Sequence, residues 1–245
     1  MPPEPGVVDA RRVGPPFAVG VLAVLGVLPV VTALDPMVGV PRWLLVVAVV
    51  GLGVGGVGLA AAVGSTLARD VGLRTLDPDS LPGDGLKAYR LPVGVGVAVA
   101  LVTLSLRALA VALGVDPAPV DWWTGAGPFG VLASVAGAVV TELLVRFGVM
   151  TLVVWLAWTY RPAIDRGVTR SGVWAGVLSA ALVGALASTP AGVVAGADPA
   201  VVVVAAAVPF VGGVAFGLLY WRYDLAAAVI AHTTASLLRA MVVAL

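Results

Sequence analysis

The sequence predicts an all-α, polytopic transmembrane helical bundle of about seven spans, and three observations carry that prediction. Hydrophobic residues make up 60% of the 245 positions, and charged residues only 11%. The mean hydropathy is +1.09. The apolar residues fall in repeated runs of about 20, the length of helix that crosses the hydrocarbon core of a bilayer. A soluble core needs no such runs, so we expect one transmembrane domain over residues 1–245.

The composition also excludes several kinds of site. The chain has no cysteine, which rules out disulfides, thiolate metal sites and a cysteine nucleophile. Its single histidine, His232, rules out a site built from several imidazoles of one chain. The formal net charge is +1 and no basic stripe is interleaved with aromatic residues, so we expect no nucleic-acid partner. The N-terminal apolar run lacks a small-residue cleavage site, which favours a retained first span over a signal peptide.

Most of the predicted spans follow directly from the lengths of the apolar runs. They cover approximately residues 17–34, 43–63, 91–115, 173–186 (or to 189), 200–219 and 225–245. The polar stretch 65–89 is expected to be a loop outside the bilayer. The first three spans and their loops occupy residues 1–127. In the second span, Gly51 and Gly55 form a small-xxx-small pattern, which is typical of close packing between helices.

The longest apolar run, residues 128–160, is either one span or two, and two would raise the total to eight. The placement of the arginines favours a single span. With a single span, lysine and arginine gather almost entirely on one side, whereas two spans would move Arg161, Arg166 and Arg170 to the other. The positive-inside rule then predicts a multi-pass protein of the cell membrane with its N-terminus in the cytoplasm and its C-terminus outside. We therefore expect one long, tilted or kinked helix that bends at Gly148.

Charged residues interrupt that long run at its middle. Glu142 and Arg146 lie four positions apart, so on a helix they share a face and can neutralise each other. A charge inside hydrocarbon costs about 3 kcal/mol even on lenient insertion scales, so the pair needs a partner or a function. In the last span, His232 and Ser236 are four apart, and Arg239 continues the same face. These residues are the candidate site; alternatively, they are internal contacts that hold helices together without chemistry.

The depth of these residues in the membrane bears on whether they can meet. Glu142 lies about 27 Å along its helix from Tyr160, and His232 about 10 Å past Asp224, at about 1.5 Å per residue. We therefore expect the two side chains to meet only if the long helix tilts or protrudes into the cytoplasm.

Three segments in the second half of the chain follow the pattern of a known family. TELLVRFGVMTLVVWL (141–156) is similar to a motif Glu-Glu-x-x-x-Arg, and FGLLYWRYDLAAAVIAHTTASLL (216–238) to a motif ending in His-x-x-x-Asn or Asp. VLSAALVGALASTPA (177–191) occupies the place of a middle motif, Phe-x-x-x-His. Together they resemble the CPBP family of intramembrane CAAX prenyl proteases and abortive-infection proteins. The likeness covers residues 128–245 and implies a CAAX-protease-like core and a peptidase acting on membrane-embedded or prenylated proteins.

The chain departs from the family at several motif positions. The first glutamate of the first motif is replaced by Thr141, and the terminal asparagine by Ser236. The middle phenylalanine and histidine fall on Val183 and Ala187, or on Gly184 and Ser188 in the alternative alignment. Only Glu142, Arg146 and His232 persist.

Three functions remain open from the sequence. In a peptidase, which needs an activated water and a stabilised oxyanion, the resemblance implies Glu142 as base, His232 as oxyanion or water partner and Arg146 as the clamp that orients Glu142. We expect no cofactor, although a divalent metal stays open; it would have two strong ligands, short of the three typical of catalytic zinc. The alternatives are a non-catalytic, pseudoenzyme-like membrane protein that binds membrane lipids or a protein partner, and a solute or proton transporter.

Overall fold

The computed structural model describes residues 10–33, 41–75, 88–112, 114, 128–160, 167–189 and 199–243. Within these ranges the secondary structure is helical, and no strand occurs. The elements are α1 (Ala10–Ala33), α2 (Arg42–Leu67), α3 (Arg90–Ala112), α4 (Pro128–Thr141), the π-helical segment η5 (Glu142–Met150), α5 (Thr151–Thr159), α6 (Arg170–Ser188), α8 (Pro199–Arg222) and α9 (Leu225–Val243).

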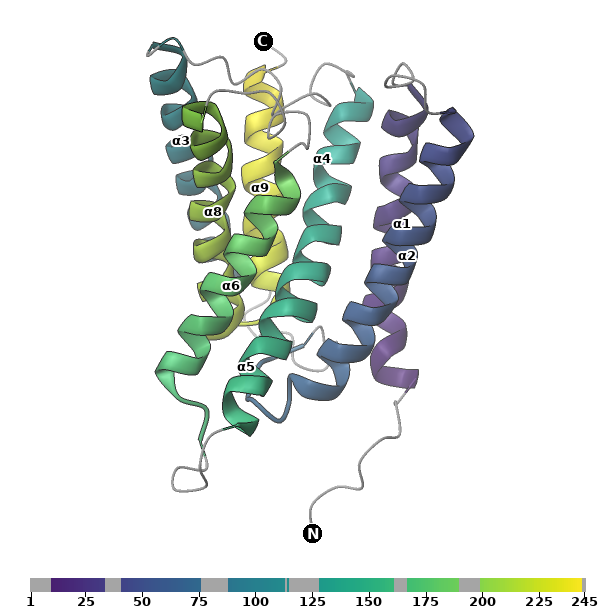
Figure 1. The fold of residues 1–245 in the computed structure, drawn as a ribbon, viewed down its shortest axis with the longest axis vertical. Helices are drawn as coiled ribbons and strands as arrows, with labels where there is room; N and C mark the ends of the chain where they lie inside the picture. The colour runs from purple at the N-terminus through teal and green to yellow at the C-terminus, as the bar shows by residue number, and fades with distance from the viewer. Residues whose placement is uncertain are drawn as a thin grey trace.

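Seven helices of the described chain are long and apolar enough to cross a membrane. This confirms the all-α, multi-pass membrane fold. The helices stand roughly side by side along the long axis of the molecule, and successive spans alternate in direction (Figure 1). As a result α1 begins at the lower end of the bundle in this view and α9 ends at the upper end.

The run over residues 128–160 forms one span, as predicted. α4, η5 and α5 follow one another without a break, and the span covers Phe129–Thr159. The expected irregularity at Gly148 takes the form of the π-helical segment that contains this residue. The departure from α-helical geometry begins earlier than expected, at Glu142.

Helix boundaries agree with the predicted spans to within a few residues, apart from two. α1 begins at Ala10 and includes Pro15 and Pro16 near its start, whereas the predicted span began at residue 17. The predicted loop from residue 65 is wrong at its beginning, because α2 continues to Leu67. Ser65 Oγ donates to the carbonyl of Arg12 at 3.1 Å, which fastens the end of α2 to the start of α1. The predicted ends of the first, third and last spans, at residues 34, 115 and 245, lie outside the described residues.

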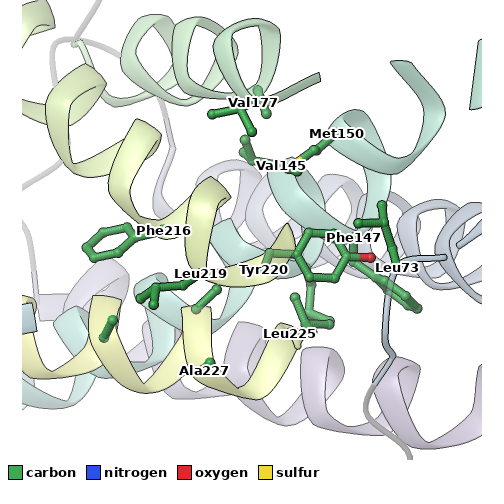
Figure 2. Close-up of a cluster of buried hydrophobic side chains, with 14 of the residues drawn as sticks. Leu73, Val145, Phe147, Met150, Val177, Phe216, Leu219, Tyr220, Leu225 and Ala227 are labelled. Atoms are coloured by element: carbon green, nitrogen blue, oxygen red, sulfur yellow. The ribbon is translucent and has the colours of Figure 1, made fainter. Parts of the chain in front are cut away.

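The most enclosed part of the bundle surrounds η5. Phe147 and Met150 of η5 and Tyr220 of α8 have no exposed surface, and Leu225 at the start of α9 is equally buried. Figure 2 shows Tyr220 beside Phe147, with Leu225 next to them. The Tyr220 hydroxyl and Thr151 Oγ1 share a hydrogen bond of 3.0 Å, so this phenol has a partner. In a bilayer such packing stabilises by van der Waals contact and hydrogen bonding, since lipid is as apolar as the core.

Close helix packing in α2 uses a different face from the one the sequence suggested. Gly51 and Gly55 face open space, with no atom within 4 Å of where a Cβ would stand. Their predicted role in packing within the bundle is therefore wrong. Gly64 instead lies against the ring of Phe147, where a Cβ would collide with the ring carbons. The glycine-rich composition indicated close packing, but the rotation of α2 about its axis decides which glycines supply it.

Candidate functional site

The candidate site is built on η5, where the long helix widens from α to π geometry over Glu142–Met150. A π-helical turn leaves backbone carbonyls that α-helical bonds no longer satisfy. The carbonyl of Arg146 receives both the backbone N–H of Thr151 and, at 3.2 Å, the Thr151 hydroxyl. Segments of this kind are rare and occur frequently at functional sites. Here the segment carries both charged residues of the span.

Glu142 lies at the centre of the site. Its side chain has no exposed surface. Oε1 lies 2.7 Å from Nδ1 of His232 on α9, and Oε2 lies 3.3 Å from Nε of Arg146 one turn along η5. The first contact is a short hydrogen bond of the kind made by charged groups. The second is an electrostatic contact, because neither Oε2 nor Nε has a hydrogen-bond partner among the described residues.

Arg146 connects this carboxylate to α8. The side chain is 2% exposed, and its Nη2 donates to the backbone carbonyl of Gly213 at 2.8 Å. Its guanidinium carbon also lies 5.9 Å from the ring centroid of Phe216 on the same helix. A cation over an aromatic face within this distance is attracted by the ring quadrupole. The guanidinium is thus held by a carboxylate, a carbonyl and a ring.

His232 is the most exposed of the three charged or titratable residues of the site, with 18% of its side chain exposed. Its ring stacks on Phe216 with 4.7 Å between centroids and 19° between planes. An ionised carboxylate can only accept a hydrogen bond, so the 2.7 Å contact with Glu142 places a proton on Nδ1. In the neutral imidazole this leaves Nε2 as a bare acceptor.

The buried charges balance within the site. The carboxylate of Glu142 carries one negative charge, the guanidinium of Arg146 one positive charge, and a neutral His232 none. Polar groups inside a membrane are tolerated when they face the bundle interior and pair with one another. The sequence prediction that Glu142 and Arg146 face inward and pair is therefore confirmed by their burial and 3.3 Å contact.

Glu142 and His232 were expected to meet only if the long helix tilts or protrudes, and the position of that helix meets this condition. In Figure 1, α5 extends further toward the lower end of the molecule than the connection between α8 and α9. Glu142 can therefore lie far from Tyr160 along its own helix and still stand level with His232. The two residues are 90 positions apart in the chain and in direct contact.

The remaining motif residues lie outside this contact network. The Ser236 hydroxyl accepts a hydrogen bond from Arg239 Nη2 at 3.3 Å, further along α9. Ser188 is exposed near the end of α6, where its hydroxyl donates to the carbonyl of Gly184 at 2.7 Å. Thr141 is half-buried at the helix position before Glu142.

The two alignments of the middle motif differ in whether a motif position falls on the inner face of α6. Val183 and Ala187 are exposed. Gly184 is buried, and a Cβ there would stand 3.8 Å from Nη1 of Arg146. The alignment through Gly184 therefore brings the motif closest to the site, but with a glycine in place of an aromatic ring.

Sequence reasoning missed two contributors to the site, both on α8. The ring of Phe216 stacks on the imidazole of His232 and also lies near the guanidinium of Arg146. Gly213 supplies the carbonyl for Arg146, and a Cβ there would come within 2.9 Å of the Ala181 Cα and 3.2 Å of Arg146 Nη2. The adjacent glycines at 212 and 213 were a detectable signal of close approach. An aromatic residue in an apolar helix carries no comparable signal.

In the structure, as in the sequence analysis, Glu142 and His232 are the two candidate metal ligands. Among the residues that the structure describes, no three side chains of His, Cys, Asp or Glu gather in one place. Glu142 and His232 are adjacent but bonded to each other.

Comparisons of the chain with protein-family models, with curated proteins and with solved structures found no match in any of the three. The class that the fold and the site define is a helical membrane protein, with seven span-length helices among the described residues and a buried carboxylate in contact with a guanidinium and an imidazole.

Proposed function

We propose that the chain is an intramembrane hydrolase with a CPBP-like core, a peptidase that cleaves membrane-associated proteins. The observation that carries this proposal is the 2.7 Å contact between Glu142 and His232. These residues belong to the two motifs, near opposite ends of the second half of the chain, that resemble the family. Their convergence is what a shared catalytic site requires.

The exposure of the two residues suggests how the chemistry is divided between them. Glu142 is sealed from its surroundings, and its oxygens face Arg146 and His232. His232 retains 18% exposure, and in this proposal it is the group that a water molecule reaches. In this proposal His232 is the general base and Glu142 orients it. The family resemblance implied Glu142 as the base instead.

The reaction then proceeds by ordinary acid–base catalysis of amide hydrolysis. Nε2 of His232 takes a proton from water as the water oxygen bonds to the carbonyl carbon of the scissile peptide. Glu142 stabilises the imidazolium through Nδ1–H, as the carboxylate of a catalytic triad does. The C–N bond breaks as the imidazolium returns the proton to the leaving nitrogen. Arg146 positions Glu142 and keeps the site electrically neutral before water is activated.

A cleavage assay tests this proposal. The purified protein, in nanodiscs, is given quenched fluorogenic peptides with and without a prenyl group. We expect the wild type to cleave at least one of them, and His232→Gln, which keeps a hydrogen-bonding side chain but no base, to lose about 100-fold or more in kcat. Met241→Leu, at an exposed position on the same helix, is the matched control and should retain activity. Equal turnover by wild type and His232→Gln would contradict the proposal.

A second candidate function is a non-catalytic bundle that binds a protein partner or lipid. It is favoured by the replaced motif residues, since Ser188 is exposed and Ser236 is bonded to Arg239 rather than to the site. In that case Glu142, Arg146 and His232 act only as a clamp across η5, α8 and α9. Absence of cleavage by the wild type, together with loss of stability in Glu142→Gln, would support this candidate over the hydrolase.

A further inference from the structure

A hollow outside the candidate site opens near the lower end of the bundle. It has a volume of about 540 Å³ and is lined by Val71, Val168, Arg170, Val173, Trp221 and Arg222. These residues come from the turn after α2, the start of α6 and the end of α8. In Figure 1 this is the end at which α6 begins and α8 ends.

The hollow combines an apolar floor with a cationic rim. Val71 and Val173 are buried, at 6% and 3% exposure, and form part of the hydrophobic core. Arg170 and Arg222 are exposed. The guanidinium of Arg222 lies 4.8 Å from the ring centroid of Trp221, so an aromatic face holds it in place.

Among the residues that the structure describes, two arginines and no carboxylate line the hollow. The nearest acidic residues along the chain are Asp70 and Asp224. Asp224 Oδ1 accepts the backbone N–H of Ala227 at 2.7 Å and caps α9, whereas Asp70 is exposed on the turn after α2. Two guanidinium groups that line one hollow can match the oxygens of a phosphate group, to which arginine forms paired hydrogen bonds.

The level of the hollow along the bundle favours a lipid over a soluble anion. It lies at the ends of two span-length helices, where α6 begins at Arg170 and α8 ends at Arg222, and Trp221 is of the residue type that gathers at membrane interfaces. The same end carries most of the arginines that the structure describes at helix ends: Arg11, Arg12, Arg69, Arg74, Arg90, Arg170 and Arg222. Anionic lipid headgroups are attracted to such a surface, and an acyl chain can continue along the buried valines.

The geometry points to a binding site for the phosphate headgroup of an anionic phospholipid between Arg170 and Arg222, with the lipid's apolar part on Val71 and Val173. The site holds the turn after α2 against α6 and α8. It is separate from the buried contact network of Glu142, and lipid binding there does not require peptidase activity.

Lipid binding by the full chain tests this site directly. Native mass spectrometry of protein released from micelles counts bound phosphatidylglycerol during a titration, with phosphatidylcholine as the neutral reference. We expect preferential retention of phosphatidylglycerol by the wild type and binding on the order of tenfold weaker in Arg170→Gln/Arg222→Gln. The matched control is Arg74→Gln/Arg90→Gln, which removes two exposed arginines at the same end but away from the lining, and should bind like the wild type.

These controls distinguish binding of phosphatidylglycerol at one specific site from general electrostatic attraction of anionic lipid to the arginine-rich end. Equal weakening in both double variants, or no weakening in either, would overturn the proposal. Inorganic phosphate is titrated as a competitor, and displacement of phosphatidylglycerol by millimolar phosphate would show a soluble-anion site instead of a lipid site. If Arg170→Gln/Arg222→Gln does not fold, Arg222→Gln compared with Arg90→Gln gives the same test, since both side chains are exposed.

Discussion

Arg146 and Arg239 both lie within transmembrane spans of this bundle, and they are held very differently. Arg146 is 2% exposed and is paired with Glu142 and with the carbonyl of Gly213. Arg239 is half-buried, and Ser236, three positions earlier on the same helix, supplies a neutral hydroxyl at 3.3 Å. Arg239 also lies near the end of α9, where a long side chain can reach toward the interface.

The difference shows how depth in the membrane decides what a charge requires. A guanidinium at the centre of a bundle needs a counter-charge, because no water is there to solvate it. A guanidinium near the end of a helix can be partly solvated outside the hydrocarbon. We therefore expect Glu142 to stabilise the centre of the protein whether or not it takes part in catalysis.

The strongest test of this contrast removes the counter-charge. Glu142→Gln keeps the shape of the side chain but leaves Arg146 buried without a carboxylate, so we expect the free energy of unfolding to fall by about 3–5 kcal/mol. Arg146→Met should cost a similar amount, since it leaves the carboxylate unpaired. The double variant should recover part of the loss, with a coupling energy of about 0.5–3 kcal/mol in denaturant titrations of the protein in micelles. Additive losses would show that the two residues are independent.

The next largest effect is expected where Arg146 meets α8. Gly213→Ala introduces a Cβ within 2.9 Å of Ala181 Cα and 3.2 Å of Arg146 Nη2, so α6 and α8 must separate. Such overpacking costs about 1–3 kcal/mol, measurable as a lower Tm. Gly212→Ala is the matched control, because its new Cβ would meet side-chain atoms no closer than 3.3 Å. Equal Tm values in the two variants would place Gly213 outside the Arg146 network.

A smaller effect should follow from removing the ring under the site. Phe216→Leu keeps an apolar side chain but abolishes the stacking on His232, for a loss of about 0.5–1.5 kcal/mol. In the hydrolase, the misplaced imidazole should also lower kcat. Phe210→Leu, on the same helix and half-buried, should leave kcat unchanged. A lower kcat in both variants would indicate a general loosening of α8.

The smallest effect is expected for the arginine nearer the end of its helix. Arg239→Met removes a charge that no carboxylate balances in the described contacts, so the free energy of unfolding should change by less than about 1 kcal/mol. Thermal unfolding in micelles, alongside Arg146→Met, measures the contrast. Equal losses for the two variants would show that depth does not separate them.

The fold was largely predictable from the sequence because hydrocarbon thickness fixes the length of an apolar run. The single long span over residues 128–160 was also predictable, because arginines on one side of the membrane distinguish one crossing from two. The rotation of each helix about its own axis was not predictable from the sequence. α2 is apolar around its circumference, so nothing in its composition distinguishes Gly51, which faces open space, from Gly64, which faces Phe147.

The site was predictable to the extent that its residues are polar. Glu142, Arg146 and His232 stand out in apolar spans, and the structure brings all three together. The segment η5 packs against α2, α6 and α8, and no feature of the local sequence marks its π-helical form. Phe216 and the carbonyl of Gly213 are an apolar ring and a backbone atom, so no residue type announces their role.

The state of the only imidazole in the chain tests the buried contact network most directly. Because His232 is the single histidine, labelling histidine with ¹⁵N gives the signals of one ring. At neutral pH we predict a neutral ring with its proton on Nδ1, held by Glu142, and a bare Nε2; in Glu142→Gln the proton should redistribute toward Nε2. A ring protonated on Nε2 in the wild type, or one whose spectrum is unchanged by Glu142→Gln, would contradict the account.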